Sequence, residues 1–144
     1  DYDTTFTLPW GEVRNVRDRH TELRARVFER GGKAREFDLV VRVYNDGVAF
    51  RYDLQSGPNL ASFTIQDELT EFRFAEDMKA WWAPADVPMP DRQEVLYSSG
   101  PVSRLGLAHT PLTLQGTNGL HLVVHEADLI EYPGMYLRKN PRAH

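Results

Sequence analysis

Alternation of apolar and polar residues on both sides of an Asn-Asp-Gly triplet constrains the fold of this chain more than any other feature. The alternation runs from Glu36 to Tyr44 and resumes from Val48 to Leu54. A period of two is typical of half-buried strands, and Asn45-Asp46-Gly47 contains residues that tolerate positive φ in tight turns. The pattern predicts an antiparallel hairpin over residues 36–54, with an apolar face that includes Phe37, Leu39, Val41 and Val43.

Weaker alternation predicts further strands along the chain. One contains Leu23, Ala25 and Val27 and ends at the Gly31-Gly32 turn, and a second hairpin is predicted at residues 112–124 around Gly116-Thr117-Asn118-Gly119. Shorter strands are predicted at residues 63–65 and 72–74, with a helical turn possible within residues 67–74. Strands at a spacing of roughly 8 to 12 residues, separated by Gly and Asn turns, are typical of antiparallel sandwiches and barrels.

The regular pattern fails between Glu76 and Gly106. This stretch contains Trp81-Trp82, Pro88, Pro90 and a Ser98-Ser99-Gly100-Pro101 run, and it predicts a long irregular excursion. Such loops are usually functional or disordered, and two adjacent tryptophans favour packing over disorder. Neither an internal repeat nor a domain boundary is evident, so we expect residues 1–144 to form a single domain.

Composition excludes several classes of protein. The 144 residues include no cysteine, 17 Lys and Arg, and 21 Asp and Glu, and 41% are hydrophobic. A disulfide-stapled mini-protein and a thiolate zinc finger are therefore excluded. The longest apolar runs are a few residues, far short of the ~20 needed to cross a bilayer, so we expect no membrane partner. The net charge is −4 and the basic residues of the 14–30 stretch alternate with acidic ones, which argues against a nucleic-acid partner.

His121, His125 and Glu126 invite a metal-site interpretation. Residues four apart in a strand share a face but lie ~13 Å apart, so the two histidines cannot chelate one ion. The spacing also differs from that of the metalloprotease helix motif. We therefore expect both histidines on the solvated face of a strand.

Glu126 differs from these histidines because of its place in the pattern. It follows the apolar strand at residues 120–124 and shares the parity of Leu122 and Val124, so it falls just beyond the core-facing positions. A carboxylate at a sheet end beside Pro133-Gly134 could reach a ligand or a neighbouring domain. A capping or turn role is the alternative, and the local pattern leaves both open.

Local motifs reveal no catalytic centre. Glycoside hydrolysis needs two carboxylates facing each other roughly 5 to 10 Å apart, and no local spacing singles out such a pair. The densest acidic cluster, Asp67, Glu68 and Glu71, is typical of a solvated loop. The chain has no nucleophile elbow, no phosphate-cradling glycine loop and no cysteine nucleophile.

Three segments together carry a family resemblance: Arg42–Tyr52, Thr110-Pro111-Leu112 and Glu126–Met135. They resemble the N-terminal domain of glycoside hydrolase family 97, which comprises bacterial α-glucosidases and α-galactosidases. The resemblance implies an all-β, antiparallel β-super-sandwich of the galactose mutarotase-like kind, of which residues 1–144 would be a fragment lacking some leading strands. It also implies a catalytic (β/α)8 barrel in the same polypeptide, export to the periplasm or medium, and an α-linked oligosaccharide as the parent enzyme's substrate.

The resemblance assigns a role to Glu126 and none to any catalytic residue. In the family, the corresponding glutamate reaches from the sandwich into the active site and helps to hold calcium. Calcium takes 6 to 8 oxygens and one glutamate supplies at most two, so this chain would hold only part of the site and be inactive alone. Trp81 and Trp82 could stack on a sugar, although burial is the alternative. An independent carbohydrate-binding module and a module that merely docks on the barrel are competing hypotheses.

Overall fold

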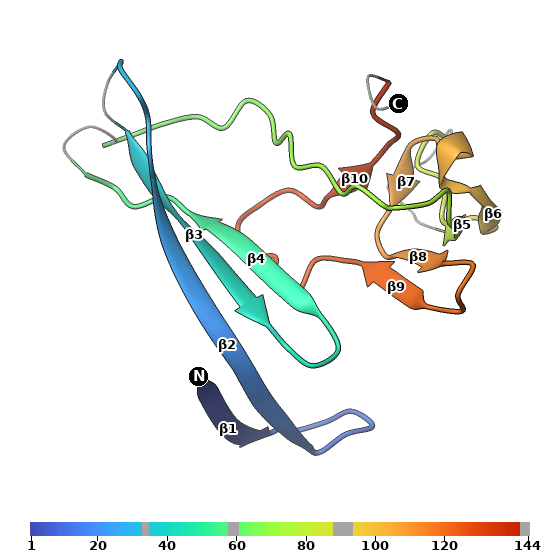
Figure 1. The fold of residues 1–144 in the computed structure, drawn as a ribbon, viewed down its shortest axis with the longest axis horizontal. Helices are drawn as coiled ribbons and strands as arrows, with labels where there is room; N and C mark the ends of the chain where they lie inside the picture. Colours follow the sequence, from blue (N-terminus) through green and yellow to red (C-terminus); the bar gives the residue numbers. More distant parts are fainter. Residues whose placement is uncertain (33–34, 58–60, 88–93, 142–144) are drawn as a thin grey trace. The chain divides into compact units, whose positions relative to one another are not determined.

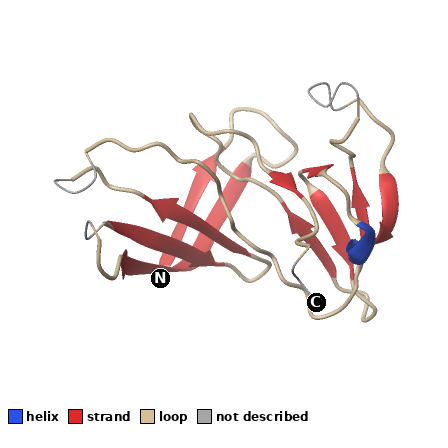
Figure 2. Ribbon diagram, turned by 90° about the horizontal axis from the view of Figure 1, so that it is seen from above, coloured by secondary structure: helices blue, strands red, loops and turns tan. Residues whose placement is uncertain are grey.

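The computed structural model describes all residues except 33–34, 58–60, 88–93 and 142–144. Residues 1–68 and 69–144 form two compact units, and both are built from antiparallel strands (Figures 1 and 2). Within the described residues, the only helical element is the 3-10 turn η2 at Val102–Arg104. No helix among them has the length and apolar character of a membrane span. The predicted all-β, antiparallel fold class is confirmed.

The first unit contains one four-stranded sheet in which neighbours in sequence are neighbours in space. Its strands, in the order β1-β2-β3-β4, are Tyr2–Thr7, Asn15–Phe28, Glu36–Val43 and Val48–Asp53. The predicted hairpin is therefore confirmed, with Val43 opposite Val48. Its turn is closed by the Tyr44 N–H, which donates to the Gly47 carbonyl at 2.8 Å. Gly47 does not have a positive φ, contrary to the basis on which the turn was predicted.

The two faces of this sheet are not buried as the alternation predicts. Leu23, Val41 and Phe50 lie side by side on the apolar face, yet Leu23 is 61% exposed. The opposite face carries Asp38 and Val40, which are only 5% and 4% exposed. The more buried face is thus the charged one.

Arginine side chains explain this reversal. Val40 lies between Arg24 of β2 and Arg51 of β4 in the sheet register, and the aliphatic stems of arginines cover neighbouring apolar surface while their heads stay in water. Asp38 accepts hydrogen bonds from Arg26 Nε at 2.9 Å and from Arg24 Nη1 at 3.3 Å. Arg24 Nη1 also lies 3.2 Å from Asp53 Oδ2, so one guanidinium ties β2 to both following strands.

The second unit contains a four-stranded sheet and a two-stranded ladder. The sheet has the order β6-β5-β8-β9, formed by Ser98–Pro101, Lys79–Trp82, Leu112–Gln115 and His121–Val124. The ladder pairs β7, Ala108–His109, with β10, Tyr136–Leu137. The second predicted hairpin is confirmed as β8–β9.

Four local expectations are wrong. Residues 63–65 and 72–74 form no strand, and residues 67–74 contain no helical turn. The stretch from Glu76 to Gly106 is not irregular throughout, because it contributes β5, β6 and η2. These elements are three or four residues long, too short for a period of two to be distinguishable, and β6 consists of Ser, Gly and Pro, which have low strand propensity.

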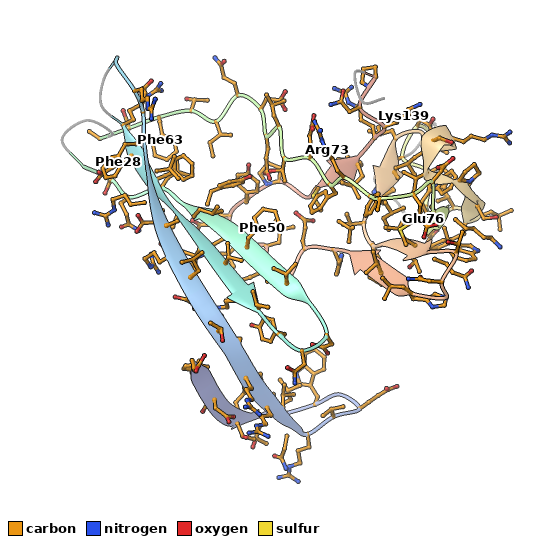
Figure 3. All side chains as sticks on the ribbon, in the orientation of Figure 1. Phe28, Phe50, Phe63, Arg73, Glu76 and Lys139 are labelled. Carbon is orange, nitrogen blue, oxygen red and sulfur yellow. The ribbon has the colours of Figure 1, made fainter. Side chains whose placement is uncertain are left out.

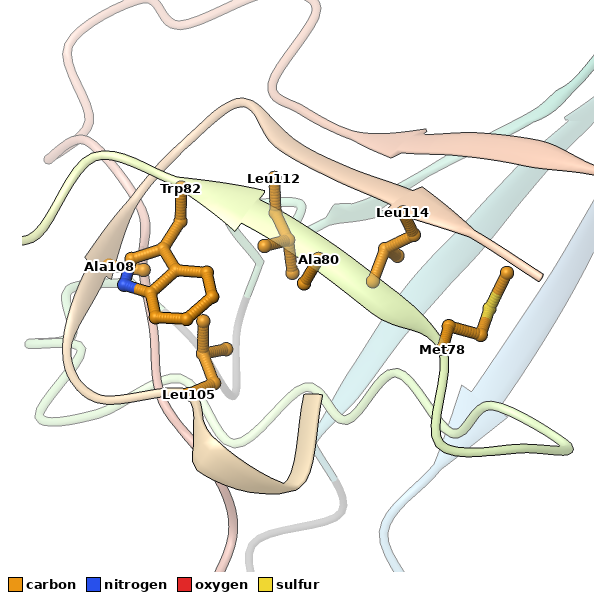
Figure 4. Packing of buried hydrophobic residues seen from close by; sticks show 7 residues of the cluster. All are labelled: Met78, Ala80, Trp82, Leu105, Ala108, Leu112 and Leu114. Atoms are coloured by element: carbon orange, nitrogen blue, oxygen red, sulfur yellow. The ribbon is translucent and has the colours of Figure 1, made fainter. Parts of the chain in front are cut away.

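The apolar core of the second unit lies on one face of its sheet (Figure 4). Ala80 of β5, Leu114 of β8 and Leu122 of β9 occupy adjacent positions across the strands. Ala80 and Leu114 are fully buried. The cluster consists of Met78, Ala80, Trp82, Leu105, Ala108, Leu112 and Leu114, and Leu122 and Val124 pack against it. Strand β9 is therefore fixed to the core through its even-numbered residues.

Candidate functional site

Glu126 follows directly from the strand that the core holds in place. Leu122 and Val124 of β9 face the cluster, and β9 pairs with β8 from Leu112↔Val124 to Gln115↔His121. The strand ends at Val124, two residues before Glu126. Because the ladder fixes the register of β9, the point at which the chain leaves the sheet toward Glu126 is fixed as well.

A carboxylate clamp holds the far end of the same hairpin. Glu76 accepts a hydrogen bond from the Thr117 backbone N–H at 2.9 Å and another from the Thr117 hydroxyl at 2.6 Å. Both hydrogen bonds hold the pKa of Glu76 below its usual range, and the bond from the Thr117 hydroxyl has the larger effect. A Cβ at Gly116 would lie 2.6 Å from Glu76 Oε1, so the clamp requires glycine at that position. Figure 3 shows Glu76 beside this sheet.

The neighbouring carboxylate forms a second clamp of the same design. Asp77 accepts from the Ser103 N–H at 2.8 Å and from the Ser103 hydroxyl at 2.7 Å, and these bonds lower the pKa of Asp77. Consecutive residues before β5 thus fasten the β8–β9 turn and η2. Local sequence patterns did not reveal either clamp, because Glu76 and Thr117 are 41 residues apart.

The Glu126 side chain is partly exposed and lies near Pro133-Gly134. A Cβ placed on Gly134 would be 3.9 Å from Glu126 Oε2 and 3.9 Å from Leu129 Cδ2. Within the described residues, the Glu126 carboxylate has no hydrogen-bond or ion-pair partner. The capping alternative would require a partner of that kind, so the arrangement favours a carboxylate that is available to a ligand.

No metal site is complete within the described part of the chain. It contains no group of three or more His, Asp or Glu side chains close enough to hold an ion. A partly exposed, unpartnered carboxylate nevertheless fits a calcium ligand, because calcium prefers carboxylate oxygens. Any remaining ligands would have to come from outside this set of residues. His121 and His125 are both exposed, as predicted for the solvated face.

The tryptophan pair is divided between two environments. Trp82 is 8% exposed and belongs to the core cluster. Trp81 points to the other face of β5 and is partly exposed, with Lys79 Nζ 4.5 Å from its ring centroid. The buried alternative thus applies to Trp82, whereas Trp81 as a sugar-stacking residue stays a prediction.

A cavity of about 360 Å³ in the first unit is a second place where a ligand could bind. Its wall is mainly apolar, and Phe28 and Phe63 contribute to it from different segments of the unit (Figure 3). At its edge Arg35 Nη2 lies 2.6 Å from Glu29 Oε1, so the two charged groups satisfy each other. None of the predicted site residues lines this cavity.

The all-β, antiparallel fold is that of an N-terminal β-sandwich domain of the glycoside hydrolase family 97 kind. The model of the Glycosyl-hydrolase 97 N-terminal family matches residues 1–144, and the chain belongs to this family. The expected resemblance is therefore confirmed over the whole chain.

Individual relatives agree with this assignment. A retaining alpha-galactosidase of Bacteroides thetaiotaomicron is 27% identical over 119 residues, covering 72% of this chain and 17% of the relative. A probable retaining alpha-galactosidase of Streptomyces bingchenggensis is 42% identical over 71 residues, covering 49% of this chain and 10% of the relative.

Solved structures match almost the whole chain. Structures of a glycoside hydrolase family 97 enzyme from Pseudoalteromonas sp. strain K8, one in complex with acarbose and one in complex with panose, are 30% identical with a TM-score of 0.87. They cover 97% of this chain, which spans only 21% of their length. The chain thus corresponds to about a fifth or less of the proteins that it matches.

Proposed function

We propose that this chain is the non-catalytic N-terminal β-sandwich domain of a calcium-dependent glycoside hydrolase acting on α-linked sugars. In this proposal the domain packs on the catalytic barrel of the same polypeptide and supplies Glu126 to the active-site calcium. The observation that carries the proposal is the partly exposed Glu126 carboxylate, unpartnered within the described residues, just after a strand that the core fixes. The family membership and the names of the relatives support the substrate class.

The chain's own residues would contribute position rather than chemistry. Calcium, when bound, would supply a positive charge that stabilises negative charge in the active site. The β8–β9 ladder and the Glu76 clamp would hold the strand that precedes Glu126. Glu126 would present up to two oxygens, and its lack of an arginine or lysine partner within the described residues leaves both available.

An exchange of one oxygen for an amide nitrogen tests the role of Glu126. In the full-length polypeptide, Glu126→Gln should weaken calcium binding by at least about tenfold and lower hydrolysis of aryl α-galactoside or aryl α-glucoside at limiting calcium. Calcium affinity is measured by isothermal titration calorimetry, and the two substrates together report the sugar preference. The matched control is Asp128→Asn, which removes an exposed carboxylate two residues away.

The control defines what would contradict the proposal. If Glu126→Gln and Asp128→Asn bind calcium as tightly as the native protein, Glu126 is not a ligand. If both weaken binding equally, the effect is one of general charge, and the specific role of Glu126 is also lost. The carbohydrate-binding alternative predicts no calcium effect in either variant.

A further inference from the structure

One face of the sheet in the second unit carries Trp81 among polar side chains. In the sheet register, Trp81 of β5 lies opposite Ser99 of β6 and Thr113 of β8. Gln115 continues the same face two residues along β8, between its partners on β5 and β9. Paired strands lie about 4.8 Å apart and side chains at opposed positions share a face, so these residues form one continuous surface. The Trp81 face consists of Lys79, Trp81, Ser99, Thr113, Gln115 and His121.

The Trp81 face lies on the opposite side of the sheet from the apolar core. Ala80 and Leu114, which are fully buried, occupy the alternate positions of β5 and β8, and Figure 4 shows their side of the sheet. Trp82 belongs to the core cluster, whereas Trp81 is partly exposed. The core does not use the Trp81 ring, so this large aromatic surface is available to a ligand.

The polar neighbours of the Trp81 ring have unused hydrogen-bonding capacity. Gln115 and Thr113 are partly buried, and their amide and hydroxyl groups both donate and accept. The charged face of the first sheet differs, because Arg26 there donates to Asp38. Within the described residues, no hydrogen bond involves the side chains of Ser99, Thr113, Gln115 or His121.

The charge of the Trp81 face favours a neutral ligand. Lys79 is its one permanently charged side chain, and it forms no ion pair within the described residues. An anionic polymer requires a concentrated basic surface, which a single lysine does not provide. Lys79 Nζ lies 4.5 Å from the centroid of the Trp81 ring. Its stem is flexible, so the ammonium group can move aside for a ligand and donate to its hydroxyl oxygens.

We propose that the Trp81 face binds an α-linked hexose oligosaccharide. The apolar C–H side of a pyranose ring packs on an aromatic ring, and its hydroxyl groups exchange hydrogen bonds with polar side chains beside that ring. Trp81 makes the stacking contact, and Gln115 and Thr113 fix the orientation of the sugar. The inference rests on the proposed function for the class of sugar. It goes beyond that function because binding at this face requires neither calcium nor Glu126.

Oxidation of individual tryptophans tests the proposal in the full-length polypeptide. N-bromosuccinimide oxidises accessible indole rings, and peptide mass spectrometry gives the rate at Trp81 with and without sugar. Maltoheptaose and stachyose serve as probes, because they present α-linked glucose and α-linked galactose. Trp10 is the matched control, since it is 83% exposed and lies in the first unit.

Sugar binding predicts that Trp81 is oxidised in the absence of sugar and is protected, in a saturable manner, by at least one of the two probes. The rate at Trp10 should not change. Gln115→Ala should raise the half-protecting concentration roughly two- to tenfold, the effect of one lost hydrogen bond. Gln66→Ala, which removes an exposed glutamine of the first unit, should leave that concentration unchanged.

Three results overturn the proposal. If Trp81 is not oxidised in the absence of sugar, another part of the protein covers the face. If neither probe slows the oxidation of Trp81, the face does not bind these sugars. If Trp10 is protected to the same extent, the effect is not specific to the face. An unchanged half-protecting concentration in Gln115→Ala overturns the role assigned to Gln115.

Glu126→Gln separates this inference from the proposed function. If this variant binds calcium normally while sugar still protects Trp81, the calcium role of Glu126 fails and the sugar-binding face stands. If the variant loses calcium while neither probe protects Trp81 in the native protein, the proposed function stands and the sugar-binding face fails.

Discussion

The two four-stranded sheets of this chain bury their faces by different means. In the second unit, apolar side chains from β5, β8 and β9 pack on one face, and Leu114 at their centre is fully buried. In the first unit the apolar face is largely exposed, and the residues with the least exposure, Asp38 and Val40, lie among paired arginines. The strand that leads to Glu126 thus belongs to the sheet with a buried apolar core.

This difference has consequences for stability. Apolar burial contributes free energy in proportion to area removed from water, whereas ion pairs between partly exposed side chains contribute little and weaken in salt. We therefore expect the second unit to be sensitive to side-chain volume. The first unit should be sensitive to pH and salt.

The largest expected effect is that of a cavity in the second sheet. Leu114→Ala should lower the free energy of unfolding by about 3 kcal/mol, because it removes apolar contacts and leaves a cavity in a closely packed site. The matched change in the first sheet, Leu23→Ala, should cost less than about 0.5 kcal/mol at its exposed position. Urea unfolding followed by tryptophan fluorescence measures both.

Equal losses for the two leucine variants would break the comparison. They would mean that the apolar face of the first sheet is covered in the native protein, so that its exposed residues are core residues of a larger assembly.

The two hairpin turns provide a sharper test at smaller magnitude. Gly119 of the β8–β9 turn has φ 82°, whereas Gly47 of the β3–β4 turn does not have a positive φ, and a Cβ at either glycine meets no atom within 4 Å. Gly119→Ala should therefore destabilise the protein by about 1 kcal/mol through backbone strain alone. Gly47→Ala should be neutral or slightly stabilising. Thermal unfolding of the two variants, each against the native protein, measures the difference.

A neutral Gly119→Ala would show that the β8–β9 turn tolerates another conformation. The requirement for glycine at position 116 would then be weaker, because it assumes that the turn is rigid.

The sequence predicted both hairpins because each combines alternation with a turn signal. It also placed Glu126 just beyond the end of a strand, and β9 does end two residues earlier, at Val124. It missed β1 and the first half of β2, because half of β1 is threonine and the first half of β2 has three consecutive charged residues, Arg17 to Arg19, so neither shows an apolar alternation. A period of two identifies two faces but does not say which one is covered.

Other features were beyond local patterns because they depend on contacts between distant residues. The clamp of Glu76 on Thr117 links residues 41 apart, and the burial of Asp38 depends on arginines of a neighbouring strand. Strand β5 was missed because its three apolar residues, Ala80, Trp81 and Trp82, are consecutive and show no alternation before Pro84. His109 is buried, and its Nε2 has no hydrogen-bond partner within the described residues. No motif around it indicated such an environment.

The smallest expected effect is the acid response of the first sheet. The hydrogen bond from Arg26, with a further one from Arg24, holds the pKa of Asp38 below its ordinary value of 3.8. Because the folded-state pKa is lowered, the stabilising contribution of Asp38 is present above pH 3.8 and is lost as the pH falls through the folded-state value. Asp38→Asn should therefore lower the melting temperature at neutral pH and flatten its decline below about pH 4.

Salt distinguishes this electrostatic contribution from packing. Arg24 and Arg26 are about half exposed, so added salt should screen their attraction to Asp38 and reduce the difference between Asp38→Asn and the native protein at neutral pH. The difference produced by Leu114→Ala should not shrink in the same way, because it arises from lost apolar contacts. The melting-temperature difference for Asp38→Asn could instead be insensitive to both salt and acid. Asp38 would then stabilise the sheet by shape and hydrogen bonding alone. The two sheets would differ in composition but not in the kind of interaction that stabilises them.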